Sequence, residues 1–292
     1  MNFLLAGIFS LLNGINSSET TLEESCFFSG DTSYPLSSFE IKYHFDTINS
    51  KTAATDFNTK YNEAEREIIL AINRISSRVI KSGKVLVLPD SLSNQILDYS
   101  PYPDSLPNFD TLPKLILVSR RIQAFAIYEK GILKRWGPVS SGKKSTPTPA
   151  GLFHTNFKVK RKISSENSSW ILPWYFNFYA ERGIAFHQYA LPGYPASHAC
   201  TRLQEKDAKW IYDWADMWRV SGTTGSVIKI GTPVIIFGDY DYEGVKPWLQ
   251  LPNDHQATLI NEKEFEEINS YKPKMHKDLV LRKEVNKKSP TK

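Results

Sequence analysis

One cysteine, Cys200, stands among side chains that can do chemistry with a thiol. His198 precedes it by two positions, His187 precedes it by thirteen, and Arg202 follows it by two. A cysteine reacts as the thiolate, so a catalytic cysteine needs a base or a cation within reach. An arginine can bind both oxygens of a carboxylate through its planar guanidinium group. These residue types predict nucleophilic acyl chemistry on a substrate that carries a carboxylate.

Two strands are needed to bring these residues together. The apolar run 183–186 leads directly into His187 and predicts one strand, and Cys200 would lie on the next. The intervening loop, residues 191–195, reads Leu-Pro-Gly-Tyr-Pro. If the two strands lie side by side, His187 approaches the sulfur from the neighbouring strand. Alternate residues of a strand share a face, so Cys200 and Arg202 would point the same way.

The same residues allow less specific interpretations. A free cysteine is commonly a small buried hydrophobe, and a cysteine near a histidine can ligate a metal. The nearest carboxylates, Glu181 and Glu205, do not complete a ligand set, so no metal site is expected. Ser197 lacks the flanking glycines of the Gly-x-Ser-x-Gly hydrolase motif. On spacing alone, a catalytic Cys200 and an inert, buried Cys200 both remain open.

A longer sequence pattern surrounds the cysteine. Residues 183–203 end in Pro-Ala-Ser-His-Ala-Cys-Thr-Arg-Leu, residues 146–153 read Thr-Pro-Thr-Pro-Ala-Gly-Leu-Phe, and residues 231–234 read Gly-Thr-Pro-Val. Together these stretches resemble the signature of L,D-transpeptidases of the YkuD type. The resemblance spans residues 114–238, less than half of the chain.

The resemblance implies both a fold and a reaction. The fold would be mostly β with some α, a β-sandwich-like L,D-transpeptidase catalytic domain preceded by a small α+β N-terminal region. In the family, the cysteine attacks the bond between the L-centre of diaminopimelate and the terminal D-Ala of a tetrapeptide stem. A thioester forms, D-Ala leaves, and the amine of a second stem resolves the thioester into a cross-link. No cofactor is implied.

The resemblance also implies a role for each residue of the motif. Cys200 would be the nucleophile and His187 the general base. The remaining positions would shape the site, hold the oxyanion through backbone N–H groups, or bind the substrate. The site-shaping and oxyanion positions are Ser197, His198 and Ala199, and the substrate-binding positions are Arg202, Tyr194 and Gly193.

Ala199 departs from the family pattern, which has glycine there. A glycine beside a nucleophile often supplies a positive φ or leaves room for the substrate backbone. If φ is positive, alanine costs about 1 kcal/mol, the scale of left-handed strain in an L-residue. Gln188 and Tyr189 are a second departure, since the family tends to carry small residues after the histidine. Both departures concern how the substrate lies in the site.

Two alternative functions follow from the same residues. If water resolves the acyl-enzyme in place of an amine, the protein is a peptidoglycan L,D-carboxypeptidase. If Ala199 blocks the chemistry, the protein is a non-catalytic cell-wall binding protein. A segment at 61–89 favours the second alternative, because it resembles half of a LysM module, a module that binds glycan chains of N-acetylated sugars. There, Ile68, Ile72, Ile75 and Val79 predict one face of a helix, and residues 85–88 predict a strand.

Changes in hydrophobicity, proline content and charge along the chain predict five segments. Residues 1–18 are apolar and of signal-peptide length, although no Lys or Arg precedes the apolar run. Residues 19–97 form an N-terminal region, and the four prolines of residues 98–113 predict a linker. Residues 114–240 are the catalytic domain, in which a helix is expected at 204–218. Residues 241–292 are a polar, basic tail.

Composition limits the partners. Hydrophobic residues make up 41% and charged residues 23% of the 292, which predicts a packed core. The net charge of +5 is mild and is concentrated in the tail, so no nucleic acid partner is expected. No stretch is long enough to span a membrane. We expect an exported protein of the periplasm or cell envelope whose partners are peptidoglycan stem peptides and, through the N-terminal region, glycan strands.

Overall fold

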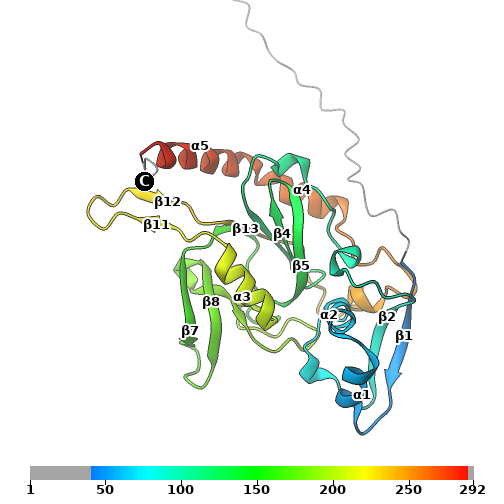
Figure 1. Ribbon diagram of the computed structural model, residues 1–292. Helices are drawn as coiled ribbons and strands as arrows, with labels where there is room; N and C mark the ends of the chain where they lie inside the picture. The colour runs from blue at the N-terminus through cyan, green and yellow to red at the C-terminus, as the bar shows by residue number, and fades with distance from the viewer. Residues whose placement is uncertain (1–40, 289–292) are drawn as a thin grey trace, which may run out of the picture. The chain divides into compact units, whose positions relative to one another are not determined.

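A nine-stranded β-sheet carries the cysteine motif within residues 41–288, the part of the chain that the computed structural model describes (Figure 1). The strands lie in the order β6-β13-β3-β4-β5-β10-β9-β8-β7. Neighbours are antiparallel, except that β13 pairs with β3 and β10 with β9 in parallel. The bounds are β3 (Leu115–Ser119), β4 (Ala124–Glu129), β5 (Ile132–Ser140), β6 (Gly151–His154), β7 (Phe157–Ile163), β8 (Ile171–Tyr179), β9 (Ile184–Gln188), β10 (Thr201–Leu203) and β13 (Pro233–Phe237).

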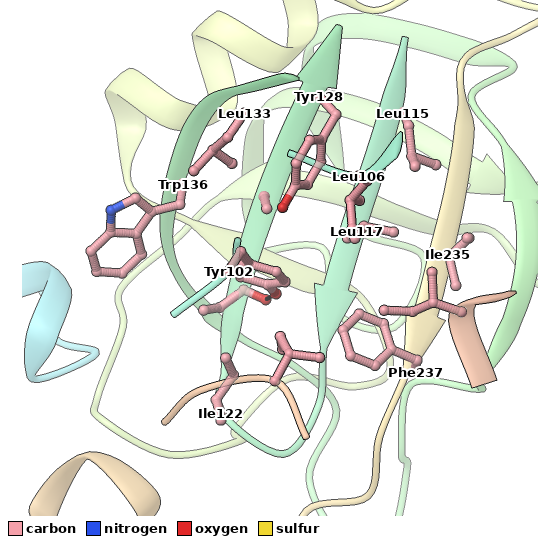
Figure 2. Close-up of a cluster of buried hydrophobic side chains, with 14 of the residues drawn as sticks. Tyr102, Leu106, Leu115, Leu117, Ile122, Tyr128, Leu133, Trp136, Ile235 and Phe237 are labelled. Atoms are coloured by element: carbon pink, nitrogen blue, oxygen red, sulfur yellow. Dashed lines mark hydrogen bonds between the residues drawn. The ribbon is translucent and has the colours of Figure 1, made fainter. Parts of the chain in front are cut away.

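The central strands are buried on both faces, which explains their continuous apolar sequences. Along β3, Leu115 and Leu117 belong to one hydrophobic cluster, whereas Ile116 and Val118 belong to another on the opposite face. The same alternation holds along β4 and β13. Figure 2 shows the first cluster, in which Tyr102 packs with side chains of these strands.

The second cluster lies inside the curl of the sheet. Phe125 of β4 and Phe178 of β8 both contribute to it, although β5, β10 and β9 separate these strands in the sheet order. Helix α3 (Glu205–Trp214) covers the cluster with Ala208 and Ile211. The helix ends earlier than the predicted 204–218, because the backbone at Ala215 is extended. The expected mostly β, sandwich-like architecture is confirmed.

A small α+β arrangement precedes the sheet. Strands β1 (Tyr43–Ile48) and β2 (Lys84–Pro89) pair in antiparallel, with helices α1 (Ala53–Lys60) and α2 (Glu63–Ile72) between them in the chain. Asn62 and Glu65 form a capping box that begins α2. Strand β1 was not expected from the sequence, because it shows no clear alternation of buried and exposed residues.

Helix α2 ends at Ile72, before the predicted helical face is complete. Arg74 has a φ of 57°, which a helix cannot continue through. Asn73 stabilises this end: its side-chain amide donates to the Ile69 and Val87 carbonyls at 2.9 and 2.8 Å and accepts from the Val87 N–H. Ile75 is therefore free to leave the helix axis, and it forms a β-bridge with Pro192.

The proline-rich stretch 98–113 differs from the expected linker. Its prolines do prevent regular structure beyond short 3₁₀ turns. Its aromatic and aliphatic side chains, however, are buried in the cluster of Figure 2. The Tyr102 hydroxyl donates to the Ala124 carbonyl at 2.6 Å, and the Tyr128 hydroxyl donates to the Pro103 carbonyl at 2.7 Å. This stretch packs against the sheet because apolar residues separate its prolines.

The segment after residue 241 also differs from the expected tail. It contains α4 (Glu262–Ser270) and α5 (Lys272–Lys288), and Trp248, Ile268 and Met275 are buried in the same cluster as the proline-rich stretch. Glu264, also buried, pairs with Arg121 at 2.6 Å. The apolar residues that produce this packing follow one another at spacings of three and four, a helical period that the prediction of a polar tail overlooked: Phe265, Ile268, Tyr271, Met275 and Leu279. A short hairpin of β11 (Arg219–Val220) and β12 (Val227–Lys229) completes the described elements.

Some expectations fall outside the described residues. They are the export signal at 1–18 and the segment from there to residue 40, which includes Cys26. Within residues 41–288, no helix is long and apolar enough to cross a membrane.

Candidate active site

Strands β9 and β10 pair in parallel, so the strand that carries His187 lies beside the strand that follows Cys200. Thr201 lies opposite Phe186, and Arg202 lies opposite His187. Cys200 immediately precedes β10, in a bend, and not within the strand as expected. The pairing across this junction is what brings residues thirteen positions apart in the sequence to one place.

A pocket of about 280 Å³ opens at this junction. Six of the eight predicted site residues line it: His187, Ser197, His198, Ala199, Cys200 and Arg202. The other two, Gly193 and Tyr194, are not among its lining residues. A side chain at Gly193 would approach Ile75 to 3.0 Å, and the Tyr194 carbonyl accepts from Ser140. Both positions shape the loop that leads to the pocket.

His187 is almost fully buried, with 3% of its surface exposed. Its Nδ1 lies 3.0 Å from the Gln188 carbonyl oxygen, which can only accept. Nδ1 therefore carries the proton and Nε2 is left with a lone pair. Burial, together with the smaller effect of the nearby Arg202 charge, lowers the pKa of His187 to about 4, against the hydrogen bond to Gln188, which raises it. The imidazole is neutral at pH 7 and can accept a proton.

Cys200 carries a free thiol and lies partly exposed in the pocket. Burial of the sulfur raises the pKa of the thiol above its ordinary value. A backbone hydrogen bond from Ala185 and the charges of Lys162 and Arg202 counteract this effect without reversing it. The thiol is therefore protonated at neutral pH. A reaction at this sulfur needs a base to take the proton, and the neutral imidazole of His187 lines the same pocket.

Ala199 has a φ of 80°, in the left-handed region where glycine is the ordinary residue. Its methyl group is buried and belongs to the cluster inside the curled sheet. Its carbonyl accepts a hydrogen bond of 2.7 Å from the Thr148 hydroxyl. The backbone before the cysteine thus keeps the conformation that glycine would supply, with an alanine in place.

The loop after β5 holds Ser197 in place. Ser197 donates its N–H to the Ser141 carbonyl at 3.0 Å, and its own carbonyl accepts from the Lys143 N–H at 2.9 Å. Gly142 and Ser197 form an isolated parallel bridge between these contacts. The residue is buried. The contacts fix the backbone of Ser197 beside the pocket, and its site-shaping role stays a prediction.

His198 lies on the exposed side of the pocket. The edge of its ring contacts Trp170, with ring centroids 5.0 Å apart, and its Nε2 lies 3.1 Å from the ammonium group of Lys143. Trp170 belongs to the turn between β7 and β8. His198 therefore links this turn to the loop after β5 at the rim of the pocket.

Arg202 places a cation in the pocket. Its guanidinium donates to the Ala196 carbonyl at 2.9 Å and lies 4.7 Å from the centre of the Tyr189 ring. The stacking orients the planar group, and the remaining N–H donors can meet a carboxylate. Tyr189, a departure from the family pattern, thus supports the arginine.

Several lining residues were not identified from the sequence. Most come from the β7–β8 hairpin and the turn before β9, including Lys162, Glu166, Trp170, Tyr175 and Arg182. Lys162 lies over the Tyr175 ring at 4.6 Å. The dense aromatic sequence of β8 was the available signal. Without the strand pairing, however, nothing connected that sequence with Cys200.

The described residues contain no group of three His, Cys, Asp or Glu side chains that could hold a metal ion.

Residues 113–236 match the YkuD family, the L,D-transpeptidase catalytic domain. The resemblance seen in the sequence is confirmed over this stretch. The match does not include residues 61–89, so their likeness to LysM stays a prediction. A search of curated proteins returned no match.

Solved L,D-transpeptidases have partly similar structures. One from Stackebrandtia nassauensis is 23% identical over 44% of this chain and 57% of its own, with a TM-score of 0.36. One from Xylanimonas cellulosilytica is 19% identical over 67% of this chain and 98% of its own, with a TM-score of 0.43. L,D-transpeptidase 1 from Mycobacterium tuberculosis is 23% identical over 43% and 62%, with a TM-score of 0.33. The chain spans little more than half of the Stackebrandtia structure.

Proposed function

We propose that this protein is a peptidoglycan L,D-transpeptidase that works through a thioester on Cys200. The observation that carries the proposal is that the Cys200 thiol and the buried His187 imidazole line one pocket of a YkuD-type domain. Arg202 supplies the cation for a carboxylate of the stem peptide.

The first step would release D-Ala. The Cys200 sulfur attacks the carbonyl carbon of the L-centre of diaminopimelate as its proton passes to Nε2 of His187. The C–N bond to the terminal D-Ala breaks, and the departing amine takes that proton from His187. Backbone N–H groups around Ala199 and Cys200 would hold the oxyanion of the tetrahedral intermediate.

The second step would form the cross-link. The amine of a second stem attacks the thioester carbonyl, gives a proton to His187, and the C–S bond breaks. The sulfur leaves as a thiolate and recovers its proton from His187. Two half-reactions through one acyl-enzyme predict ping-pong kinetics.

The test uses purified tetrapeptide muropeptides and mass spectrometry of the products. The wild type should produce cross-linked dimers with loss of D-Ala, and Cys200→Ala should produce none. Cys26→Ala is the matched control, because it removes the other cysteine of the chain and should leave the activity in place. Equal activity of Cys200→Ala and wild type would contradict the proposal.

The same product analysis distinguishes a transpeptidase from an L,D-carboxypeptidase. Tripeptide monomers without dimers would mean that water resolves the thioester, and the protein would then be an L,D-carboxypeptidase. A folded protein that binds muropeptides without changing them would be a cell-wall binding protein. The acceptor is the only difference between the first two reactions.

We further propose that the protein works in the periplasm or cell envelope, where its substrate lies, and that residues 61–89 contact glycan strands. Co-sedimentation with insoluble peptidoglycan tests the second point. Retention should fall when exposed residues of this segment are changed, and unchanged retention would contradict a glycan contact there.

A further inference from the structure

The side chain of Thr148 connects two backbone segments of the pocket wall. Its hydroxyl donates to the Ala199 carbonyl at 2.7 Å and accepts from the Gly142 N–H at 2.8 Å. Thr148 is 1% exposed, so neither hydrogen bond competes with solvent. We propose that Thr148 is a positioning residue that aims the Cys200 N–H at the oxyanion. This inference rests on the proposed acyl-transfer function.

The first reason for this proposal is the geometry of the Ala199–Cys200 peptide unit. The Ala199 carbonyl and the Cys200 N–H belong to the same planar unit, and in a trans peptide they point in opposite directions. The described chain contains no cis peptide bond. Holding the Ala199 oxygen toward Thr148 therefore directs the Cys200 N–H away from it. None of the hydrogen bonds found among residues 41–288 uses this N–H, so it is available to a ligand.

The second reason is the strained backbone at Ala199. At a φ of 80°, Ala199 occupies a region that an alanine does not prefer. The conformation persists because the surroundings hold it. The Thr148 hydrogen bond acts directly on this peptide unit, whereas the backbone contacts of Ser141 and Lys143 act on Ser197, two residues earlier.

Thr148 is itself held firmly. Its carbonyl accepts from the Arg120 guanidinium at 3.1 Å, and that group also donates to the Gly238 carbonyl at 2.7 Å. Gly142 allows the loop to close around the hydroxyl: a Cβ there would lie 2.1 Å from the Thr146 carbonyl oxygen and 2.6 Å from the Thr148 nitrogen. The threonine can therefore act as a rigid support.

Only serine and threonine fit this role. Their hydroxyl accepts one hydrogen bond and donates another, whereas valine has nearly the same shape and does neither. Thr148→Val should leave the fold in place and release the Ala199–Cys200 peptide unit. An oxyanion donor acts only if it lies at the position that the charge will occupy, so a rotated unit slows acyl transfer.

The experiment compares two reactions of the same sulfur. Acylation by imipenem joins the sulfur to the β-lactam carbonyl carbon and breaks the ring C–N bond, whose nitrogen takes a proton, so an oxyanion develops. Alkylation by iodoacetamide displaces iodide and develops none. We expect Thr148→Val to lower the acylation rate about tenfold or more, as part of the roughly 10²–10³ that a lost oxyanion donor costs. The alkylation rate should change less than about twofold, since no oxyanion is involved.

Two variants serve as controls. Thr148→Ser keeps the hydroxyl and should restore most of the acylation rate. Thr155→Val removes a buried hydroxyl of the same kind, which donates to the Asp216 carbonyl and accepts from the Thr232 N–H outside the pocket. Its rates of acylation and alkylation should both stay close to those of the wild type. Melting temperatures of all variants monitor the fold.

Each other outcome overturns the inference. Unchanged acylation in Thr148→Val would mean that the hydroxyl has no positioning role. A parallel fall of acylation and alkylation would mean a purely structural role. If the wild type itself is alkylated but not acylated, the proposed function fails and the inference fails with it. This result is distinguishable from the two above, because it concerns the wild type and not Thr148→Val. If Thr148→Val does not fold, Thr148→Ala compared with Thr148→Ser gives the same contrast.

Discussion

Arg202 lies directly opposite His187 in the parallel pair of β10 and β9. Its positive charge is close enough to lower the pKa of the imidazole, in addition to the larger effect of burial. The arginine therefore has two consequences for the pocket. It places a cation in the pocket, and it adds to the lowering of the pKa of His187.

The first prediction concerns the pH dependence of acylation. The rate constant kcat/KM reports the pKa of the free enzyme's base, so for wild type the acid limb should have its midpoint near pH 4. In Arg202→Gln, the loss of the charge should move the midpoint upward, toward the ordinary histidine value. Imipenem acylation measured across pH 3–8 checks this.

Arg182→Gln is the matched control, since Arg182 also lines the pocket but does not contribute to the shift at His187. Its acid limb should coincide with that of the wild type. A midpoint that stays in place in Arg202→Gln would contradict an electrostatic link between the two residues.

The second prediction concerns stability. The folded pKa of His187, about 4, lies below the ordinary 6.5. Between these values the unfolded chain binds the proton and the folded chain does not, so the free energy of unfolding decreases as pH falls from 6.5 to 4. The shift corresponds to about 3 kcal/mol at about 1.4 kcal/mol per pKa unit. In His187→Gln, this contribution to the pH dependence of the free energy of unfolding should be absent.

Urea unfolding at several pH values measures the difference. The slope of the free energy of unfolding against pH should be smaller in His187→Gln than in the wild type between pH 4 and 6.5. Equal slopes in the two proteins would mean that the buried imidazole is not the source.

The third prediction concerns the positive φ of Ala199. A β-branched residue is more restricted there than alanine, so Ala199→Val should lose about 2 kcal/mol of folding free energy. Ala199→Gly should change it by less than about 1 kcal/mol, because relief of the strain is offset by the loss of a buried methyl group and by a more flexible unfolded chain.

Ala196→Val is the control in the same loop, at a half-buried position whose φ is not positive. It should cost less than Ala199→Val when both are compared by denaturant unfolding. A larger loss at position 196 would argue that crowding, and not backbone strain, governs this loop.

The fourth prediction concerns Arg74, which is 2% exposed. Its guanidinium donates to the carbonyls of Ile122, Ala71 and Ile72 and lies 5.5 and 5.6 Å from the rings of Trp136 and Trp248. Arg74→Ala would leave buried carbonyls without donors and open a cavity, at a cost of about 3 kcal/mol or more.

Arg78→Ala, four residues along and exposed, should cost less than about 0.5 kcal/mol. A loss for Arg74→Ala as small as that for Arg78→Ala would contradict a stabilising role of the buried guanidinium.

Local sequence predicted the elements with strong patterns. The continuous apolar runs at β3, β4 and β13 were identified as strands because strands buried on both faces need apolar residues at every position. The proline-rich stretch has no such pattern, and its burial depends on single apolar side chains that contact the sheet after folding. The last fifty residues do have a helical period from Phe265 to Leu279, but a local period does not tell which surface the helix covers.

The motif around Cys200 could be identified from the sequence alone, because the types of side chain and their spacing in the chain limit the chemistry. The sequence determined the presence of a thiol, two histidines and an arginine, and it marked Ala199 as the unusual position. The tertiary structure decided the pKa directions of His187 and Cys200, since burial depends on what covers a group. It also decided the contact between Thr148 and Ala199, which lie 51 residues apart and meet because β10 pairs with β5.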